Sequence, residues 1–282
     1  RVFGTLKNYW PLFKSPQTLL LTVTGVAGFM SARCPIQHWS TMLGLILSLL
    51  FSIAGSTVLN MWYDRDIDQA MERTHHRPIA AGDISPLHAL LLGIIFSVLG
   101  VGIGVLLAPL YAVILLAGIF IDFFVYTIWL KRRTCWAIVW GGISGGMPIL
   151  AGRVLGMGTI DPVGILLTLS ILFWIPTHIL TFSIHYAADY SGAGIPTFPS
   201  TYSVNITRRI IAFSTVIAAA LISSAAVLIQ VNEGFLHLLG ILSGVLVMFA
   251  IYMLLRPSRK VNFGLFKYAS VYMLASMVLL AF

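Results

Sequence analysis

Residues 39–68 read WSTMLGLILSLLFSIAGSTVLNMWYDRDID, an apolar run that ends in an acidic cluster. No charged residue occurs between Trp39 and Tyr63. A helix rises about 1.5 Å per residue, so this run is long enough to cross the ~30 Å hydrocarbon core of a bilayer. Asp64, Asp66 and Asp68 follow immediately. The stretch predicts a membrane-spanning helix that carries acidic side chains to one membrane surface.

Composition extends this prediction to the whole chain. Of its 282 residues, 59% are hydrophobic and 9% are charged, and the mean hydropathy is +0.95. These values exclude an ordinary soluble globular protein. Apolar stretches of about 20 residues recur, which favours membrane helices over the short alternating segments of a β-barrel. We expect an all-α integral membrane protein that forms one domain over residues 1–282.

Turn residues and charges divide the chain into nine predicted spans. The Ser85-Pro86 pair, for example, predicts an N-cap followed by proline in the first helical turn. The nine predicted spans are 17–33, 39–62, 87–107, 109–130, 136–154, 162–184, 209–230, 235–255 and 265–281.

The basic residues support this count. With the N-terminus in the cytoplasm, all 17 Lys and Arg residues except Arg33 and Arg153 fall on the cytoplasmic side. Such an asymmetry is typical of multi-pass proteins, and we expect this one in the plasma membrane with its C-terminus outside. The net charge of +8 is spread over short loops. That distribution favours contact with the lipid bilayer and argues against nucleic acid as a partner.

The predicted cytoplasmic loops also hold most of the acidic residues. The two longest are 63–86 and 185–208, and a short one, 131–135, contributes bases. They carry six of the nine acidic residues: Asp64, Asp66, Asp68, Glu72, Asp83 and Asp189. We therefore expect a central cavity among the helices that opens to the cytoplasmic side, with the site at these loops.

The acidic cluster has a helical spacing. If the helix continues, Asn60, Asp64, Asp68 and Glu72 lie four residues apart on one face. Such a row repels itself unless a cation lies over it, and Mg²⁺ prefers oxygen ligands that it shares with phosphate. Asp66 lies on the opposite face, and we expect it to pair with a neighbouring base.

Bases near the cluster supply the second half of a diphosphate site. Arg73, Arg77 and Lys131 are the strongest candidates to neutralise such an anion, with Arg132 and Arg133 close by. The alternative is structural: a helix end held by carboxylate–arginine pairs, with the other charges solvated.

The wider sequence resembles the UbiA superfamily of intramembrane prenyltransferases, and within it the heme O synthase (protoheme IX farnesyltransferase) group. The resemblance covers about residues 55–210 in order. It is carried by NMWYDRDID (60–68), MERTHHRPI (71–79), YTIWLKRRT (126–134), GGISGGMP (141–148), FWIPTH (173–178), DY (189–190), AGIP (193–196) and TRRI (207–210).

The resemblance implies a reaction. A farnesyl group passes from farnesyl diphosphate to a vinyl group of heme B, giving heme O and pyrophosphate, with Mg²⁺ as cofactor. It assigns Asn60, Asp64 and Asp68 to catalysis through the metal, and Arg73, Arg77 and Lys131 to the diphosphate. It also implies a handover partner in cytochrome oxidase or heme A assembly.

Three further residues enter through the resemblance. The second acidic motif of the superfamily corresponds to His185-Tyr-Ala-Ala-Asp189, so Asp189 is its one carboxylate and a further metal ligand. His178 and Tyr126 are the candidates for binding heme or another acceptor.

Asp122 lies inside a predicted span, where a carboxylate is costly. We expect it either to face the cavity or to bond to a neighbouring helix.

Three alternatives stay open. Another UbiA-type enzyme would use a phenolic, quinone-precursor or glycerol-lipid acceptor. A cation or metabolite transporter would use intramembrane carboxylates, although no repeat with interrupted helices is visible. A heme chaperone would use His178 but leave the acidic row unexplained.

Overall fold

The computed structural model describes residues 9–33 and 39–282 of the chain. All regular elements in these ranges are helices. They are η1 (Trp10–Phe13), α2 (Ser15–Met30), α3 (Trp39–Tyr63), α4 (Arg65–Ala70), α5 (Pro86–Leu107), α6 (Pro109–Phe120), η2 (Ile121–Leu130), α7 (Ala137–Met157), α8 (Pro162–His185), α9 (Ala187–Gly192), α10 (Phe198–Tyr202), α11 (Val204–Leu228), α12 (Glu233–Leu255) and α13 (Arg259–Ala281).

Eight helices of the described ranges are long and apolar enough to cross a membrane: α3, α5, the continuous α6–η2 pair, α7, α8, α11, α12 and α13. The prediction of an all-α multi-pass membrane protein is confirmed. Helix α2, at 16 residues, is shorter. The ninth span, at 17–33, therefore stays a prediction, as does the cytoplasmic opening.

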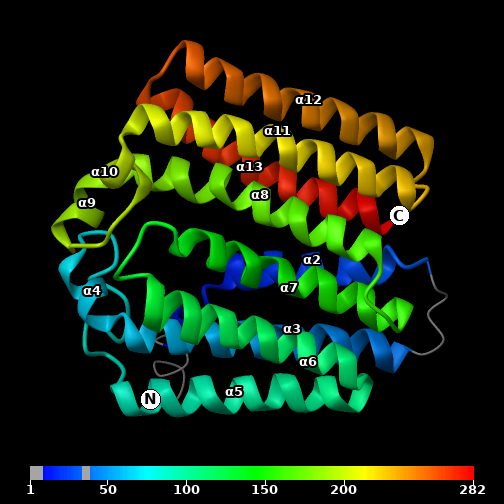
Figure 1. The fold of residues 1–282 in the computed structure, drawn as a ribbon. Coiled ribbons are helices and arrows are strands. Elements are labelled where there is room, and N and C mark those ends of the chain that lie inside the picture. The colour runs from blue at the N-terminus through cyan, green and yellow to red at the C-terminus, as the bar shows by residue number, and fades with distance from the viewer. Residues whose placement is uncertain (1–8, 34–38) are drawn as a thin grey trace.

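The long helices lie side by side, and α4, α9 and α10 gather at one end of the bundle (Figure 1). The C-terminal end of α13 lies at the opposite end. Helix α2 packs on α7, α3 on α5, and α8 on α11. The backbones of α2 and α7 come very close together, since a Cβ built on Gly152 would lie 1.8 Å from the carbonyl oxygen of Gly25. Small residues permit such close contacts between membrane helices.

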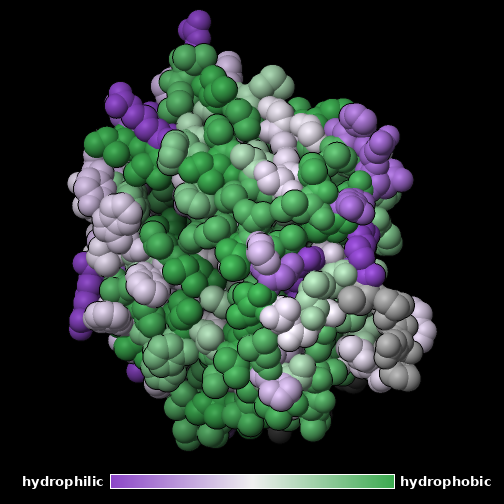
Figure 2. Space-filling view, turned by 45° about the vertical axis from the view of Figure 1, so that its right-hand side comes forward, coloured by the Kyte–Doolittle hydropathy of each residue, from purple (hydrophilic) through white to green (hydrophobic). Residues whose placement is uncertain are grey.

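Apolar side chains dominate the outer surface. Figure 2 shows a face that is mainly hydrophobic, with most of its hydrophilic residues towards the edges. Leu106 and Phe213, for example, are 86% and 68% exposed. A surface of this kind matches a lipid environment rather than water.

Serine caps set several helix starts. Ser85 accepts a hydrogen bond from the backbone N–H of His88, which confirms the predicted cap. Ser203 and Ser258 cap α11 and α13 in the same way, so these helices begin at 204 and 259, before the predicted spans 209–230 and 265–281. Basic residues lie near both starts, at Arg208 and Arg209 in α11 and at Arg259 and Lys260 in α13, and hydropathy alone assigns them to loops.

The acidic segment keeps helical spacing across a turn. The N–H of Asp64 donates to the carbonyl of Asn60 at 2.9 Å, and that of Asp68 to the carbonyl of Asp64 at 2.8 Å. Helix α4 then ends at Ala70 because the next residue is extended. Asn60, Asp64 and Asp68 thus follow one another as predicted, whereas the expectation that Glu72 shares their helix face was wrong.

A candidate metal and diphosphate site

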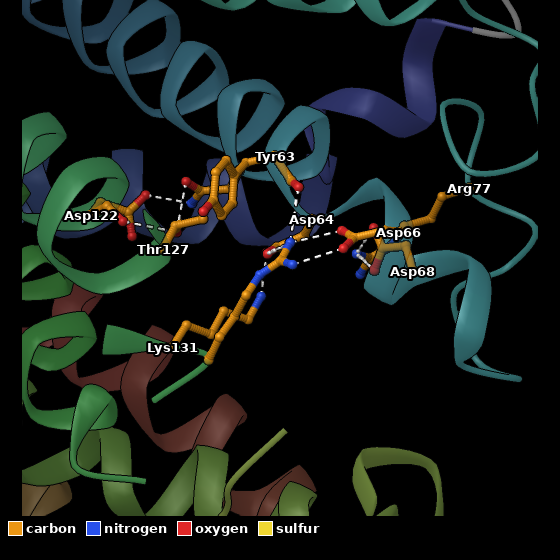
Figure 3. A network of polar contacts seen from close by, with 10 residues as sticks. Tyr63, Asp64, Asp66, Asp68, Arg77, Asp122, Thr127 and Lys131 are labelled. Atoms are coloured by element: carbon orange, nitrogen blue, oxygen red, sulfur yellow. Dashed lines mark hydrogen bonds and ion pairs between the residues drawn. The ribbon is translucent and has the colours of Figure 1, made fainter. Parts of the chain in front are cut away.

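Each aspartate of the acidic segment pairs with a base (Figure 3). The Arg77 guanidinium donates hydrogen bonds to both carboxylate oxygens of Asp68, at 2.7 and 2.8 Å. Asp64 forms an ion pair with Lys131. The side chains of Asp64 and Asp68 are only 5% and 6% exposed. These pairs place Arg77 and Lys131, two of the predicted diphosphate ligands, directly on the predicted metal ligands.

Asp66 is exposed, unlike the carboxylates of Asp64 and Asp68, and shares Arg132 with Asp64. It is 62% exposed and accepts two hydrogen bonds from Arg132, both at 2.7 Å. The hydrogen bonds from Arg132 lower the pKa of Asp66 below its usual value. The predicted pairing of Asp66 with a neighbouring base is confirmed.

Lys131 is held in its charged form. Burial by itself would lower the pKa of Lys131, but the adjacent Asp64 carboxylate outweighs that effect and raises the pKa. Its ammonium group also lies 5.9 Å from the centre of the Tyr126 ring. Tyr126 therefore lies beside the charged end of the site, and its ring packs against Gly141 of α7.

One carboxylate oxygen at the site has no hydrogen-bond donor. Oδ1 of Asp64 is buried and accepts no hydrogen bond from the described residues. The Arg132 guanidinium is 3.8 Å away. Buried polar atoms rarely lack a hydrogen-bond partner. A carboxylate oxygen whose lone pairs are free can bind a hard cation such as Mg²⁺.

The oxygen donors of this segment fit such a cation. Asp64 and Asp68 supply carboxylates, and Asn60 supplies an amide oxygen. Across residues 9–33 and 39–282, no three His, Cys, Asp or Glu side chains meet in a metal-like group. The remaining ligands would come from water and from the diphosphate, as is usual for Mg²⁺.

Asn60 is connected to a helix of unusual winding. Element η2 is a π-helix and carries Asp122 and Thr127 (Figure 3). Asp122 accepts hydrogen bonds from Nδ2 of Asn60 at 2.7 Å and from the hydroxyl of Ser56 at 2.6 Å. Thr127 donates to Oδ1 of Asn60 at 2.9 Å. Of the two expectations for Asp122, bonding to a neighbouring helix is what the structure shows. π-helical segments often occur at functional sites.

Asp189 lies against the loop after α4 instead of facing Asp64. The carboxylate of Asp189 accepts hydrogen bonds from the backbone N–H groups of Glu72, at 2.9 Å, and Arg73, at 3.2 Å. These bonds tie α9 to the segment that carries the predicted base Arg73. The structure thus gives Asp189 a contact that fixes the loop, and its role as a metal ligand stays a prediction.

Arg73 has hydrogen-bonding capacity to spare. Its guanidinium lies 5.0 Å from the ring centre of Phe182 and 5.7 Å from that of Tyr186. Its Nε is buried and has no hydrogen-bond partner within the described part of the chain. An arginine that lies over two adjacent aromatic rings and has an unused donor is suited to an incoming anion.

His178 lies in an aromatic stack on α8. Its ring is sandwiched between Trp174 at 4.9 Å and Phe266 at 4.5 Å, and Nδ1 is 3.2 Å from the hydroxyl of Ser270. Phe266 in turn contacts Phe182 at 5.4 Å, the ring under Arg73. A continuous row of ring contacts therefore joins the predicted acceptor residue to a predicted diphosphate base.

Sequence reasoning missed Lys14. This residue has a left-handed backbone (φ 40°) between η1 and α2 and lines a hollow of about 360 Å³ with Arg77, His76 and Asp83. Burial, followed by repulsion from Arg77 and Lys131, lowers the pKa of Lys14 to about 8. The signal in the sequence was a lysine directly before a helix that starts with Ser15-Pro16.

Fold and site together define a class: a multi-pass α-helical membrane protein with a carboxylate–base cluster suited to a metal diphosphate. The sequence pattern of the UbiA prenyltransferase family matches residues 20–274, and the chain belongs to that family.

Named relatives agree with the resemblance to the heme O synthase group. A protein from Archaeoglobus fulgidus named protoheme IX farnesyltransferase is 34% identical over 278 residues, which cover 97% of this chain and 94% of that protein. One from Thermofilum pendens with the same name is 40% identical over 196 residues, covering 70% of this chain and 69% of that protein.

Solved structures share the fold. One described as digeranylgeranylglyceryl phosphate synthase has a TM-score of 0.81 at 18% identity and covers 99% of this chain and 98% of that one. A UbiA homolog from Archaeoglobus fulgidus bound to GPP and Mg²⁺ has a TM-score of 0.69 at 17% identity, covering 98% of this chain and all of that one. At these identities the likeness concerns architecture alone.

Proposed function

We propose that the protein transfers the farnesyl group of farnesyl diphosphate to a vinyl group of heme B, with Mg²⁺ as cofactor, and releases heme O and pyrophosphate. The observation that carries the diphosphate half is the cluster of buried, base-paired carboxylates at Asp64 and Asp68. The acceptor and the prenyl group are supported by the relatives named protoheme IX farnesyltransferase. The UbiA homolog bound to GPP and Mg²⁺ supports the metal.

The bases at the site assist the departure of pyrophosphate. Lys131 and Arg77 now bind the carboxylates of Asp64 and Asp68. A diphosphate offers them more negative charge, so they exchange carboxylate for phosphate oxygens and expose the carboxylates. Mg²⁺ held there by Asp64, Asp68 and Asn60 would supply further positive charge to the leaving group. Arg73 adds its unused Nε donor.

The proposed reaction breaks one bond of the farnesyl donor and forms a new carbon–carbon bond to heme B. The bond between C1 of the farnesyl group and the diphosphate oxygen breaks, and its electron pair leaves with pyrophosphate. The vinyl π electrons form the new bond to C1, water adds to the other vinyl carbon, and one proton is lost. The aromatic row from Phe182 to His178 offers ring faces that stabilise cationic charge, and it is the proposed heme-binding side.

Charge distribution supports the placement of this site in the cell. Most bases lie on the side that carries α4 and the loop at 131–135, which favours the cytoplasmic face of the plasma membrane. The N-terminus would then be cytoplasmic and the C-terminus outside. The product is hydrophobic, so a handover partner in cytochrome oxidase or heme A assembly is part of the proposal.

A product assay tests the function. Purified protein is incubated with Mg²⁺, farnesyl diphosphate and heme B, and the extracted pigments are analysed by mass. We expect a new pigment with the mass of heme O, and its loss in Asp64→Ala and Asp68→Ala variants that remain folded. Release of pyrophosphate with phenolic or glycerol-lipid acceptors but never with heme B would overturn the choice of acceptor.

A further inference from the structure

A carboxylate inside the membrane-spanning part remains unexplained by the proposed chemistry. Asp122 is in η2, part of the span Pro109–Leu130. Its hydrogen-bond partners in the described chain are neutral: Ser56 at 2.6 Å, Asn60 at 2.7 Å and Ser144 at 3.4 Å. Intramembrane carboxylates are costly and usually serve a function.

The contact with Asn60 determines which way its amide points. Nδ2 of Asn60 donates to Oδ2 of Asp122 at 2.7 Å, so the NH₂ group of the amide faces this carboxylate. The amide oxygen, which is the atom able to bind a cation, then faces away from Asp122. Ser56 donates to the same oxygen, Oδ2, of Asp122 and holds that carboxylate in place.

Thr127 provides an exchangeable partner for the amide oxygen. Its hydroxyl lies 2.9 Å from Oδ1 of Asn60 and also 2.9 Å from the main-chain oxygen of Asp122, five residues earlier. The hydroxyl has one proton for these two acceptors. It can therefore release Asn60 and donate to the backbone without leaving a buried donor unsatisfied.

We propose that Asp122 is a positioning residue that orients the Asn60 amide so that its oxygen serves as a metal ligand, with the Thr127 hydroxyl as the group that yields when the cation binds. This inference rests on the metal site of the proposed function and adds an outer shell to it. Outer-shell partners commonly change metal affinity by about 10- to 100-fold.

Mn²⁺ binding tests the inference without turnover. Free Mn²⁺ is measured by electron paramagnetic resonance during titration of the full-length protein in detergent. In Asp122→Asn the new amide can face Asn60 with either end, so we expect about tenfold weaker binding. Ser144→Ala is the matched control. It removes the 3.4 Å contact with Asp122 and a bond to the backbone oxygen of Gly141 in the same helix but leaves the Asn60 contacts in place, so it should bind within about twofold of wild type.

A double variant separates positioning from general structural damage. If Asp122 acts through Asn60, Asp122→Asn should cause no further loss in an Asn60→Ala background. Additive losses, or wild-type binding by Asp122→Asn, would overturn the inference. Should Asp122→Asn fail to fold, Thr127→Val serves instead: it removes the competing proton and should bind Mn²⁺ at least as tightly as wild type, with weaker binding counting against the proposal.

The outcome also distinguishes this inference from the proposed function. Loss of Mn²⁺ binding in Asp64→Ala with no effect of Asp122→Asn refutes only the positioning role. Unchanged Mn²⁺ binding in Asp64→Ala refutes the metal site itself.

Discussion

At the scale of single residues, two neighbouring aspartates differ sharply. Asp64 is buried and its Oδ1 accepts no hydrogen bond from the described residues, whereas Asp66 is exposed and accepts two hydrogen bonds from Arg132. We expect Asp64→Ala to reduce pyrophosphate release by at least about 100-fold, the scale of losing an electrostatic contact to a leaving group. Asp66→Ala is the control and should stay within about threefold, because exposed ion pairs contribute little.

Steady-state pyrophosphate release and thermal unfolding of both variants provide the measurement. Equal losses in the two variants would show that the buried and exposed carboxylates have no separate roles.

Lys14 gives a prediction that depends on pH. Its pKa of about 8 is below the ordinary lysine value of 10.5, so between these values the unfolded chain binds more protons than the folded one. Stability then rises with pH across that window, and the cost of burying the charge is fully present below it. Lys14→Met should therefore raise the unfolding temperature at pH 7 and remove this rise.

The same variant should bind pyrophosphate more weakly, because Lys14 lines the hollow beside Arg77. In wild type, pyrophosphate affinity should fall as pH passes through about 8, and in Lys14→Met that fall should be reduced. Isothermal titration at pH 7 and 9 measures both. A pH profile that is identical in the two proteins would exclude Lys14 from the anion site.

Sequence reasoning at this scale succeeded where contacts are local. The pairing of Asp66 with a base was predicted from the bases nearby and is what the structure shows. Glu72 failed because the helix ends at Ala70, which apolar periodicity does not reveal. Lys14 was missed since its partners at 76–83 are brought near it only by the fold.

At the scale of elements, hydropathy located the long helices but not their internal geometry. The segment 109–130 is apolar apart from Asp122 and a few hydroxyl groups, and its hydropathy does not signal that 121–130 winds as a π-helix. Long-range hydrogen bonds from Ser56 and Asn60 to Asp122 accompany that winding. Such contacts depend on the packing of α3 against η2, which a single sequence does not specify.

Glycines test the helix packing. In Gly152→Ala the added Cβ would meet the backbone oxygen of Gly25, so we expect the protein to lose at least about 1–3 kcal/mol of stability. Gly240 in α12 has open space around it, and Gly240→Ala should be neutral or stabilising by up to about 1 kcal/mol. Unfolding temperatures in one detergent compare them. Equal effects would contradict the close α2–α7 crossing.

At the scale of the whole molecule, the number of spans decides on which sides the ends lie. Nine spans place the acidic loop and the C-terminus on opposite sides of the membrane, in agreement with their positions at opposite ends of the bundle (Figure 1). The charge pattern predicted this arrangement. Seven candidate spans separate the acidic loop from the C-terminus in the described chain, so the arrangement holds whether or not α2 crosses, and α2 decides only the side of the N-terminal end.

Cysteine labelling tests this arrangement. Arg65→Cys, in a background with Cys34 and Cys135 replaced by serine, should react with an impermeant maleimide only in inside-out vesicles. A cysteine appended after Phe282 should react only in right-side-out cells. Reaction of both from one side would refute an odd number of spans between residue 65 and the C-terminus, and reaction of Arg65→Cys in right-side-out cells would refute the cytoplasmic position of the acidic loop.

The central claim is that the carboxylates at the end of α3 and in α4, with their bases, hold the metal diphosphate. A structure of the protein with Mg²⁺ and a non-reactive farnesyl thiodiphosphate tests it most directly. We predict a cation on Asp64 and Asp68, with Lys131 and Arg77 moved from the carboxylates onto phosphate oxygens. A diphosphate bound elsewhere, with the Lys131–Asp64 and Arg77–Asp68 pairs intact, would contradict the account.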